Sequence, residues 1–210
     1  MFLKICGITR LGDALHAHQH GATALGFVFW PRSPRAMSPD QAAAIIAALP
    51  ASVTSVGVFV NQAVEEIRRV IALTGIRAVQ LHGDETPQIS DGIDRPILKS
   101  VMLDEAVEAS RAWPGGTTLL LDTSDPVRRG GTGVTIDWTR AGEVARRCRV
   151  VLAGGLTPHN VEEAIETVRP FGVDVSSGVE TAPGIKDPDK VSLFLTNARR
   201  AFASVNPVNQ

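Results

Sequence analysis

Eight short apolar segments recur along the chain, and each is followed by a stretch long enough to carry a helix. They span residues 2–6, 24–29, 53–60, 77–81, 97–101, 118–122, 150–153 and 172–175. Near-continuous apolar strands that alternate with amphipathic helices are typical of a parallel sheet covered by helices. Eight βα units in 210 residues predict a single-domain (β/α)8 TIM barrel with eight parallel strands. An open, doubly wound sheet is the alternative, because periodicity does not decide whether a sheet closes.

Two helix starts carry local signals. Ser38 and Pro39 supply an N-cap and a first helical residue before 41–49, and Thr157-Pro158 repeats that signal before 160–168. In 64–71, apolar residues lie on one helical face and charged residues on the other.

Length and composition limit the classes of protein. A chain that is 44% hydrophobic over 210 residues predicts one barrel domain over 1–203, with 204–210 as a flexible tail. The formal net charge of -1 argues against a nucleic-acid or anionic-membrane partner. No apolar run approaches the ~20 residues of a membrane span. Two cysteines make no disulfide framework, so a cytoplasmic protein is expected. We also expect a small-molecule partner and a monomer or a homodimer.

Glycine and serine follow the last two apolar segments. Gly154 and Gly155 come after the seventh, and Ser176, Ser177 and Gly178 come after the eighth. Glycine lets the backbone approach an oxyanion, and hydroxyl and N–H groups donate to it. A glycine pair alone is more often a tight turn. Two such motifs on adjacent strand ends, where barrels of this kind bind phosphate, favour a phosphate site.

A thiol and an acid end two other strands. Cys6 closes the first apolar run, and Asp122 closes the sixth. Cys6 is either a core filler or a tuned acid or base, and Asp122 either caps a turn or is a catalytic acid. In a closed barrel these two residues flank the phosphate loops, which is the arrangement of a phosphosugar isomerase. The chain has no cluster with metal-ligand spacing and no GxGxxG after its first strand, so no metal or cofactor is expected.

The loop after the second strand contains two arginines, Arg32 and Arg35, and a guanidinium there would hold a carboxylate. The residues alone do not choose between them, and both are equally explained as solvated loop charges.

The glycine-rich segment 128–133 is either a mobile lid or a flexible surface loop. Helical spacing of His16, His18 and His20 suggests a metal site, but an exposed helix end is the preferred interpretation.

The ordered motifs resemble those of the phosphoribosylanthranilate isomerases of tryptophan biosynthesis. They are KICGIT at 4–9, GFVF at 26–29, PRSPR at 31–35, VGVFVN at 56–61, VQLHG at 79–83, LLDT at 120–123, GGTG at 130–133 and DVSSGVE at 174–180. Each motif alone is weak, but the ordered set covers almost the whole chain. One departure is Val134, where relatives often carry a polar residue after the glycine run; it bears on lid contacts.

The resemblance implies an Amadori rearrangement of N-(5-phosphoribosyl)anthranilate to 1-(2-carboxyphenylamino)-1-deoxyribulose 5-phosphate. It also implies Cys6 as general base, Asp122 as general acid and Arg35 as the partner of the anthranilate carboxylate. His82 would line the pocket without a role in proton transfer. Two alternatives are another phosphosugar barrel, such as indole-glycerol-phosphate synthase, and a barrel that binds a phosphosugar without turnover.

Strand parity places Lys4 on the same side of its strand as Cys6, facing the barrel interior, with Asp174 on the neighbouring eighth strand. We hypothesise from this that a buried cation biases the Cys6 thiol toward thiolate.

Overall fold

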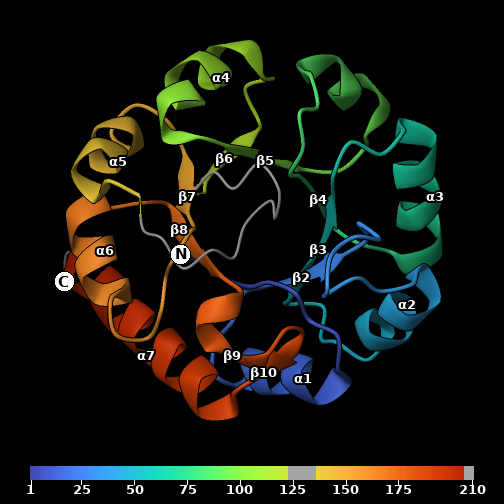
Figure 1. The fold of residues 1–210 in the computed structure, drawn as a ribbon, viewed down its shortest axis with the longest axis horizontal. Coiled ribbons are helices and arrows are strands. Elements are labelled where there is room, and N and C mark those ends of the chain that lie inside the picture. Colours follow the sequence, from blue (N-terminus) through green and yellow to red (C-terminus); the bar gives the residue numbers. More distant parts are fainter. Residues whose placement is uncertain (123–135, 206–210) are drawn as a thin grey trace.

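The computed structural model describes residues 1–122 and 136–205, and it closes eight parallel strands into a barrel with helices around the outside (Figure 1). The strands are β1 (Phe2–Ile5), β2 (Ala24–Val28), β3 (Thr54–Phe59), β4 (Ala78–Leu81), β5 (Ile97–Val101), β6 (Thr118–Leu121), β7 (Val150–Leu152) and β8 (Gly172–Val175). They pair in chain order, and β8 pairs with β1. The predicted barrel is therefore confirmed over the open sheet.

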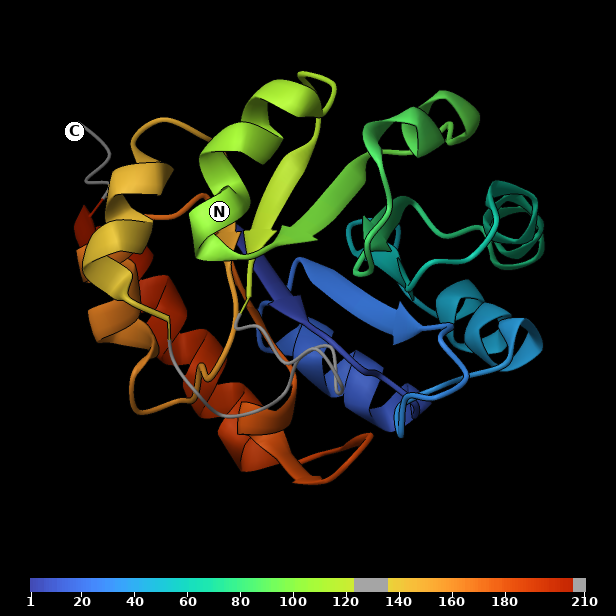
Figure 2. The same cartoon turned by 45° about the horizontal axis from the view of Figure 1, so that its top comes forward.

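The outer layer consists of α-helices that follow the strands. They are α1 (Leu11–Gln19), α2 (Pro39–Ala47), α3 (Val64–Thr74), α4 (Ala106–Ala112), α5 (Trp138–Ala145), α6 (Val161–Val168) and α7 (Pro188–Val205). Figure 2 shows α7 running beside α6 along one side of the barrel. Between β4 and β5 the chain forms only a 3₁₀ helix over Pro87–Gly92, because prolines and glycines interrupt that segment.

The strands are buried on both faces, which explains their near-continuous apolar sequences. Outward residues pack against the helices in the main core. Inward residues form small layers inside the barrel, one made of Ala24, Val56, Ala78 and Leu98 from four successive strands. Such layers fill the lumen, so function is confined to the barrel ends.

The two helix starts differ in outcome. Ser38 accepts a hydrogen bond from the Gln41 N–H, and the Gln41 side chain accepts one from the Ser38 N–H, so the predicted N-cap is confirmed. The predicted helix over 160–168 is confirmed as α6 (Val161–Val168), but its N-cap is Asn160 rather than Thr157. The Asn160 side chain accepts a hydrogen bond from the Thr157 N–H and donates one to the Gly155 carbonyl, so a turn precedes the helix.

The C-terminal part of the barrel contains two features that the sequence did not predict. After β8 an antiparallel hairpin forms from β9 (Glu180–Ala182) and β10 (Ile185–Lys186). Helix α7 extends to Val205, so Ser204 and Val205 belong to the helix rather than to the tail. No helix within the described ranges is long and apolar enough to cross a membrane.

The first and last strands meet at a seam that carries charge. Lys4 and Asp174 are register partners, and Lys4 Nζ lies 2.8 Å from Asp174 Oδ2. The Lys4 side chain is completely buried. Beyond the strand ends, the Cys6 N–H continues the pairing to the Val175 carbonyl at 2.8 Å. The predicted inward orientation of Lys4 and its pairing with Asp174 are confirmed.

Candidate active site

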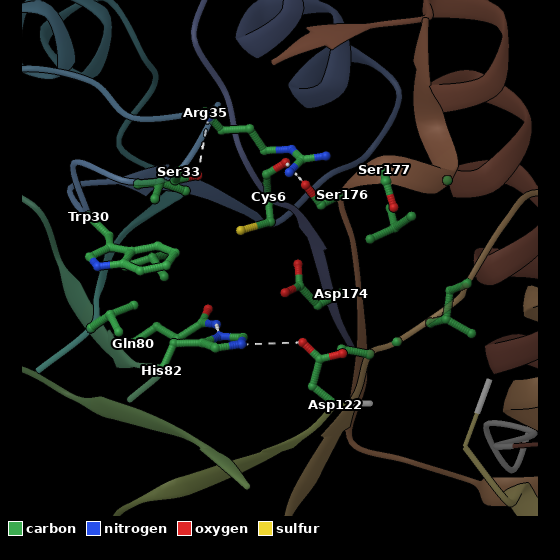
Figure 3. Close-up of a pocket in the computed structure, with 18 of the residues that line it drawn as sticks. Cys6, Trp30, Ser33, Arg35, Gln80, His82, Asp122, Asp174, Ser176 and Ser177 are labelled. Atoms are coloured by element: carbon green, nitrogen blue, oxygen red, sulfur yellow. Dashed lines mark hydrogen bonds and ion pairs between the residues drawn. The ribbon is translucent and has the colours of Figure 1, made fainter. Parts of the chain in front are cut away.

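A pocket opens at the carboxyl ends of the strands, and it contains every site residue singled out in the sequence (Figure 3). These are Cys6, Arg35, Asp122, Gly154, Gly155, Ser176, Ser177 and Gly178. In Figure 3, Cys6 and Asp122 point into the pocket from opposite sides, with Asp174 between them. Strand closure brings these residues together, because they follow β1, β2, β6, β7 and β8.

Cys6 lies directly after β1, and its sulfur occupies space left by a glycine on the next strand. A Cβ at Gly26 would lie 2.7 Å from Cys6 Sγ and 3.1 Å from Lys4 Cε. The GFVF motif therefore begins with glycine because β2 must leave room for the thiol and the lysine beside it. Val28, Val58 and the half-buried Trp30 pack around Cys6 on its apolar side.

Burial raises the pKa of the Cys6 thiol above its ordinary value of 9.0, and the charge of Lys4 lowers it without offsetting the burial. Lys4 thus lowers the pKa of the Cys6 thiol, as hypothesised. The net shift is opposite to the hypothesis, because burial outweighs the charge of Lys4 and the nearby charge of Asp174 also raises the pKa of the thiol.

Asp122 follows β6 and faces His82, which follows β4. His82 Nε2 lies 3.4 Å from Asp122 Oδ2. On the other side of the imidazole, Nδ1 lies 2.9 Å from Gln80 Nε2 and 2.8 Å from Ser100 Oγ. Side chains from β4 and β5 thus fix the ring so that one nitrogen meets the carboxyl group of Asp122.

Two glycine-bearing loops form the wall between Cys6 and Asp122. Gly154 and Gly155 have φ angles of 77° and 65°, a region that favours glycine. A Cβ at Gly178 would collide with the Leu156 carbonyl, so the loops after β7 and β8 are in direct contact. Ser176 Oγ donates to the Cys6 carbonyl at 3.1 Å and fixes the second loop against β1. Such a rigid wall of small residues suits an oxyanion.

Arg35 lines the pocket, whereas Arg32 is exposed and does not. The Arg35 guanidinium bonds Glu180 through two nitrogens, Nε at 2.9 Å and Nη2 at 2.6 Å. These hydrogen bonds raise the pKa of Arg35. The geometry therefore distinguishes two arginines that the sequence left equivalent.

Trp30 is a pocket residue that the sequence reasoning did not single out, and it adds an aromatic wall near Cys6. His82 lines the pocket, as predicted, and meets Asp122. Asp174 lines the pocket with one carboxylate oxygen on Lys4, and its Oδ1 has no hydrogen-bond partner among the described residues. An acid in a buried strand was a usable signal for Asp174, because burial is costly without a partner or a use.

The structure describes the histidines at 16, 18 and 20 but not the glycine-rich segment at 128–133. His16 bonds the Pro188 carbonyl and Ser192 and so ties α1 to α7, and His20 stacks on His16. Within 1–122 and 136–205 no group of histidine, cysteine and acidic side chains has the arrangement of a metal site. The segment 128–133, for which a lid and a surface loop were both open, and Val134 lie outside the described residues.

A closed (β/α)8 barrel whose mouth brings together a thiol, an acid and two adjacent glycine loops belongs to the class of phosphosugar-binding barrel enzymes. The profile of the N-(5'phosphoribosyl)anthranilate (PRA) isomerase family matches residues 3–197. This chain belongs to that family.

Individual relatives agree over nearly the full length. The N-(5'-phosphoribosyl)anthranilate isomerase of Pseudomonas syringae pv. tomato is 46% identical over 196 residues, covering 92% of this chain and 95% of its own. A solved isomerase in complex with reduced 1-(o-carboxyphenylamino)-1-deoxyribulose 5-phosphate is 41% identical, with a TM-score of 0.84 over 95% of this chain and 99% of that one. A structure of the Thermotoga maritima enzyme, described as dimeric, is 41% identical with a TM-score of 0.83 and the same coverage.

Proposed function

We propose that Cys6 is the general base and Asp122 the general acid of the isomerisation that this enzyme performs in tryptophan biosynthesis, the conversion of N-(5-phosphoribosyl)anthranilate to 1-(2-carboxyphenylamino)-1-deoxyribulose 5-phosphate. One observation carries the proposal. Cys6 and Asp122 face each other across one pocket, and the two glycine loops lie along its wall between them. A phosphosugar held by those loops would present its reacting carbons between the two groups.

The chemistry needs one proton donor and one acceptor. Asp122 donates a proton to the ring oxygen as the bond from that oxygen to C1′ breaks, and the anilino nitrogen forms a protonated Schiff base. Cys6, as thiolate, removes the proton from C2′, and the electron pair moves to give the enolamine. The enolamine tautomerises to the ketone. General acid and base groups contribute about 10²- to 10⁴-fold each to such steps.

The rest of the pocket matches the rest of the substrate. The loops at Gly154-Gly155 and Ser176–Gly178 receive the phosphate, and Arg35 receives the anthranilate carboxylate. Trp30, Val28 and Val58 form an apolar wall suited to the aromatic ring. Asp174 also lines the pocket, and its carboxylate is the acceptor for a sugar hydroxyl.

The test is turnover by the purified protein on freshly made N-(5-phosphoribosyl)anthranilate, followed by fluorescence. The expected result is enzyme-dependent loss of the substrate signal and formation of the aminoketose. Binding of the reduced product analogue by a protein without turnover would establish the non-catalytic alternative instead.

Replacing Arg35 with Ala should raise KM by about 10- to 100-fold, because a hydrogen-bonded charged pair contributes about 1.5–3 kcal/mol. A smaller loss of kcat should accompany it, since the carboxylate also positions the reacting carbon. Arg32→Ala is the matched control, and it should change KM less than about twofold because Arg32 lies on the surface. Steady-state kinetics of both variants provide the measurement, and equal small effects would mean that neither arginine holds the carboxylate.

The raised pKa of Cys6 predicts a thiol that is mostly protonated at neutral pH in the free enzyme. Only the thiolate reacts with iodoacetamide, so the rate of alkylation should rise about tenfold per pH unit and continue to rise to at least pH 9.0. The experiment uses Cys148→Ser, which leaves Cys6 as the single thiol. A rate that levels off below about pH 8 would mean that the Lys4 charge prevails over burial.

We propose a monomer or a homodimer in the cytoplasm. The described state of the Thermotoga maritima enzyme supports the dimer. Light scattering of the purified chain separates the two states by mass.

A further inference from the structure

Glu180 is a buried carboxylate at the edge of the pocket, and the roles proposed above do not use it. It begins the hairpin β9–β10, and its side chain is only 5% exposed. Its oxygens accept hydrogen bonds from Arg35 Nε and Nη2, from Lys186 Nζ at 2.8 Å and from the Gly184 N–H at 3.1 Å. Both oxygens are therefore engaged by cationic partners.

Glu180 lies between two cationic side chains, Arg35 and Lys186. Burial raises the pKa of Glu180, but hydrogen bonds from Arg35 and the nearby charge of Lys186 lower it by more, so the net shift is downward and the carboxylate stays ionised. Lys186 is almost fully buried, with 1% of its side chain exposed, and this burial lowers its pKa. Glu180 is therefore a buried carboxylate whose charge is stabilised by its two cationic partners.

The contact with Glu180 fixes the plane of the Arg35 guanidinium. Two parallel N–H donors of one edge bind the two carboxylate oxygens, which leaves Nη1 directed elsewhere. A free arginine side chain loses rotamer entropy when it becomes ordered. Because Glu180 already orders Arg35, the incoming ligand does not have to supply that free energy.

Lys186 extends the contact to the loop after β8. Its Nζ donates to Glu180 and also to the Ser176 carbonyl at 3.2 Å. Ser176 belongs to the loop after β8 that is proposed to hold the phosphate. The sequence of contacts from Arg35 to Glu180, Lys186 and Ser176 thus links the loop after β2 to the loop after β8. Figure 3 shows Arg35 and Ser176 side by side in the pocket.

We propose that Glu180 is a positioning residue that holds Arg35 ready for the substrate carboxylate and, through Lys186, sets its place relative to the phosphate loop. The inference rests on the proposed role of Arg35 in carboxylate binding. It makes the hairpin β9–β10 part of the substrate-recognition apparatus.

The test is Glu180→Gln, which keeps size and removes charge. The expected result is an increase of about tenfold in KM, a smaller change in kcat, and a similar loss of affinity for the reduced product analogue measured by calorimetry. Affinity for the same analogue without its carboxylate should change less than about twofold. Glu162→Gln is the matched control, because Glu162 binds Arg200 through the same two-nitrogen geometry on the outer surface; it should leave all four quantities unchanged.

A double-mutant cycle separates positioning from a purely structural effect. In an Arg35→Ala background, Glu180→Gln should cause less than about twofold further loss, because its effect acts through Arg35. An equal loss in both backgrounds would overturn the inference. If Glu180→Gln lowers the unfolding midpoint, Glu180→Gln/Lys186→Met removes the unpaired buried cation, and the same comparisons apply to it.

The remaining outcomes distinguish this inference from the proposed function. If Arg35→Ala weakens the analogue while Glu180→Gln does not, Glu180 has no positioning role and the role of Arg35 stands. If Arg35→Ala leaves binding intact, the proposed carboxylate contact itself fails, and the inference fails with it.

Discussion

Replacing Asp122 with Asn should lower kcat by about 10²- to 10⁴-fold, because ring opening needs an acidic proton that an amide does not have. Asn keeps the size of Asp, and its carbonyl oxygen can take the place of the carboxylate oxygen that faces His82. Affinity for the reduced product analogue should therefore stay within about tenfold of the unsubstituted protein. Binding and turnover should separate.

Calorimetry and steady-state kinetics on the same preparations measure both quantities. Asp94→Asn is the control, since Asp94 pairs with Arg95 on the exposed surface and should leave both quantities unchanged. Turnover that survives in Asp122→Asn would mean that another group opens the ring, with His82 the first to examine because it touches Asp122.

Replacing Cys6 with Ala should lower kcat by about 10²-fold or more, since no other group is assigned to remove the C2′ proton. The fold should persist, because Ala fits the space beside Gly26 and removes only one buried sulfur atom. Fluorescence turnover and a thermal melt together measure the effect.

Cys148→Ser supplies the comparison for Cys6→Ala. Cys148 is partly buried against the outer core and does not line the pocket, so this variant should turn over normally. Near-normal turnover in Cys6→Ala would remove the thiol from the mechanism.

The sequence predicted the barrel and the main site because both depend on local patterns. All five residues of β2 are buried, so the run is apolar throughout, and the strand ends then follow within one or two residues. Parallel strands place their carboxyl ends at one edge, so Cys6, Asp122 and the glycine loops had to converge. The inward side of Lys4 followed from strand parity in the same way.

The missed features depend on contacts between distant segments. Arg35 is distinguished from Arg32 by its hydrogen bonds to Glu180, which lies 145 positions away in the sequence. Glu180 belongs to a hairpin that has no apolar run by which the sequence could predict it. The pKa of Cys6 depends on whether the effect of burial exceeds the effect of the Lys4 charge, and the sequence pattern does not predict that difference. At α6 the helix forms as predicted, but the N-cap is Asn160 rather than Thr157, because the Asn160 side chain bonds back to the Thr157 N–H.

The seam between β1 and β8 makes the surroundings of the Cys6 thiol depend on the last strand of the barrel. Lys4 finds its partner in Asp174, and the backbone of Cys6 is held by Val175 and Ser176, all from β8 and the loop that follows it. During synthesis, Lys4 and Cys6 emerge 170 residues before Asp174 and Ser176, the partners that hold them. A nascent or truncated chain without β8 therefore has neither a partner for Lys4 nor a fixed position for the thiol.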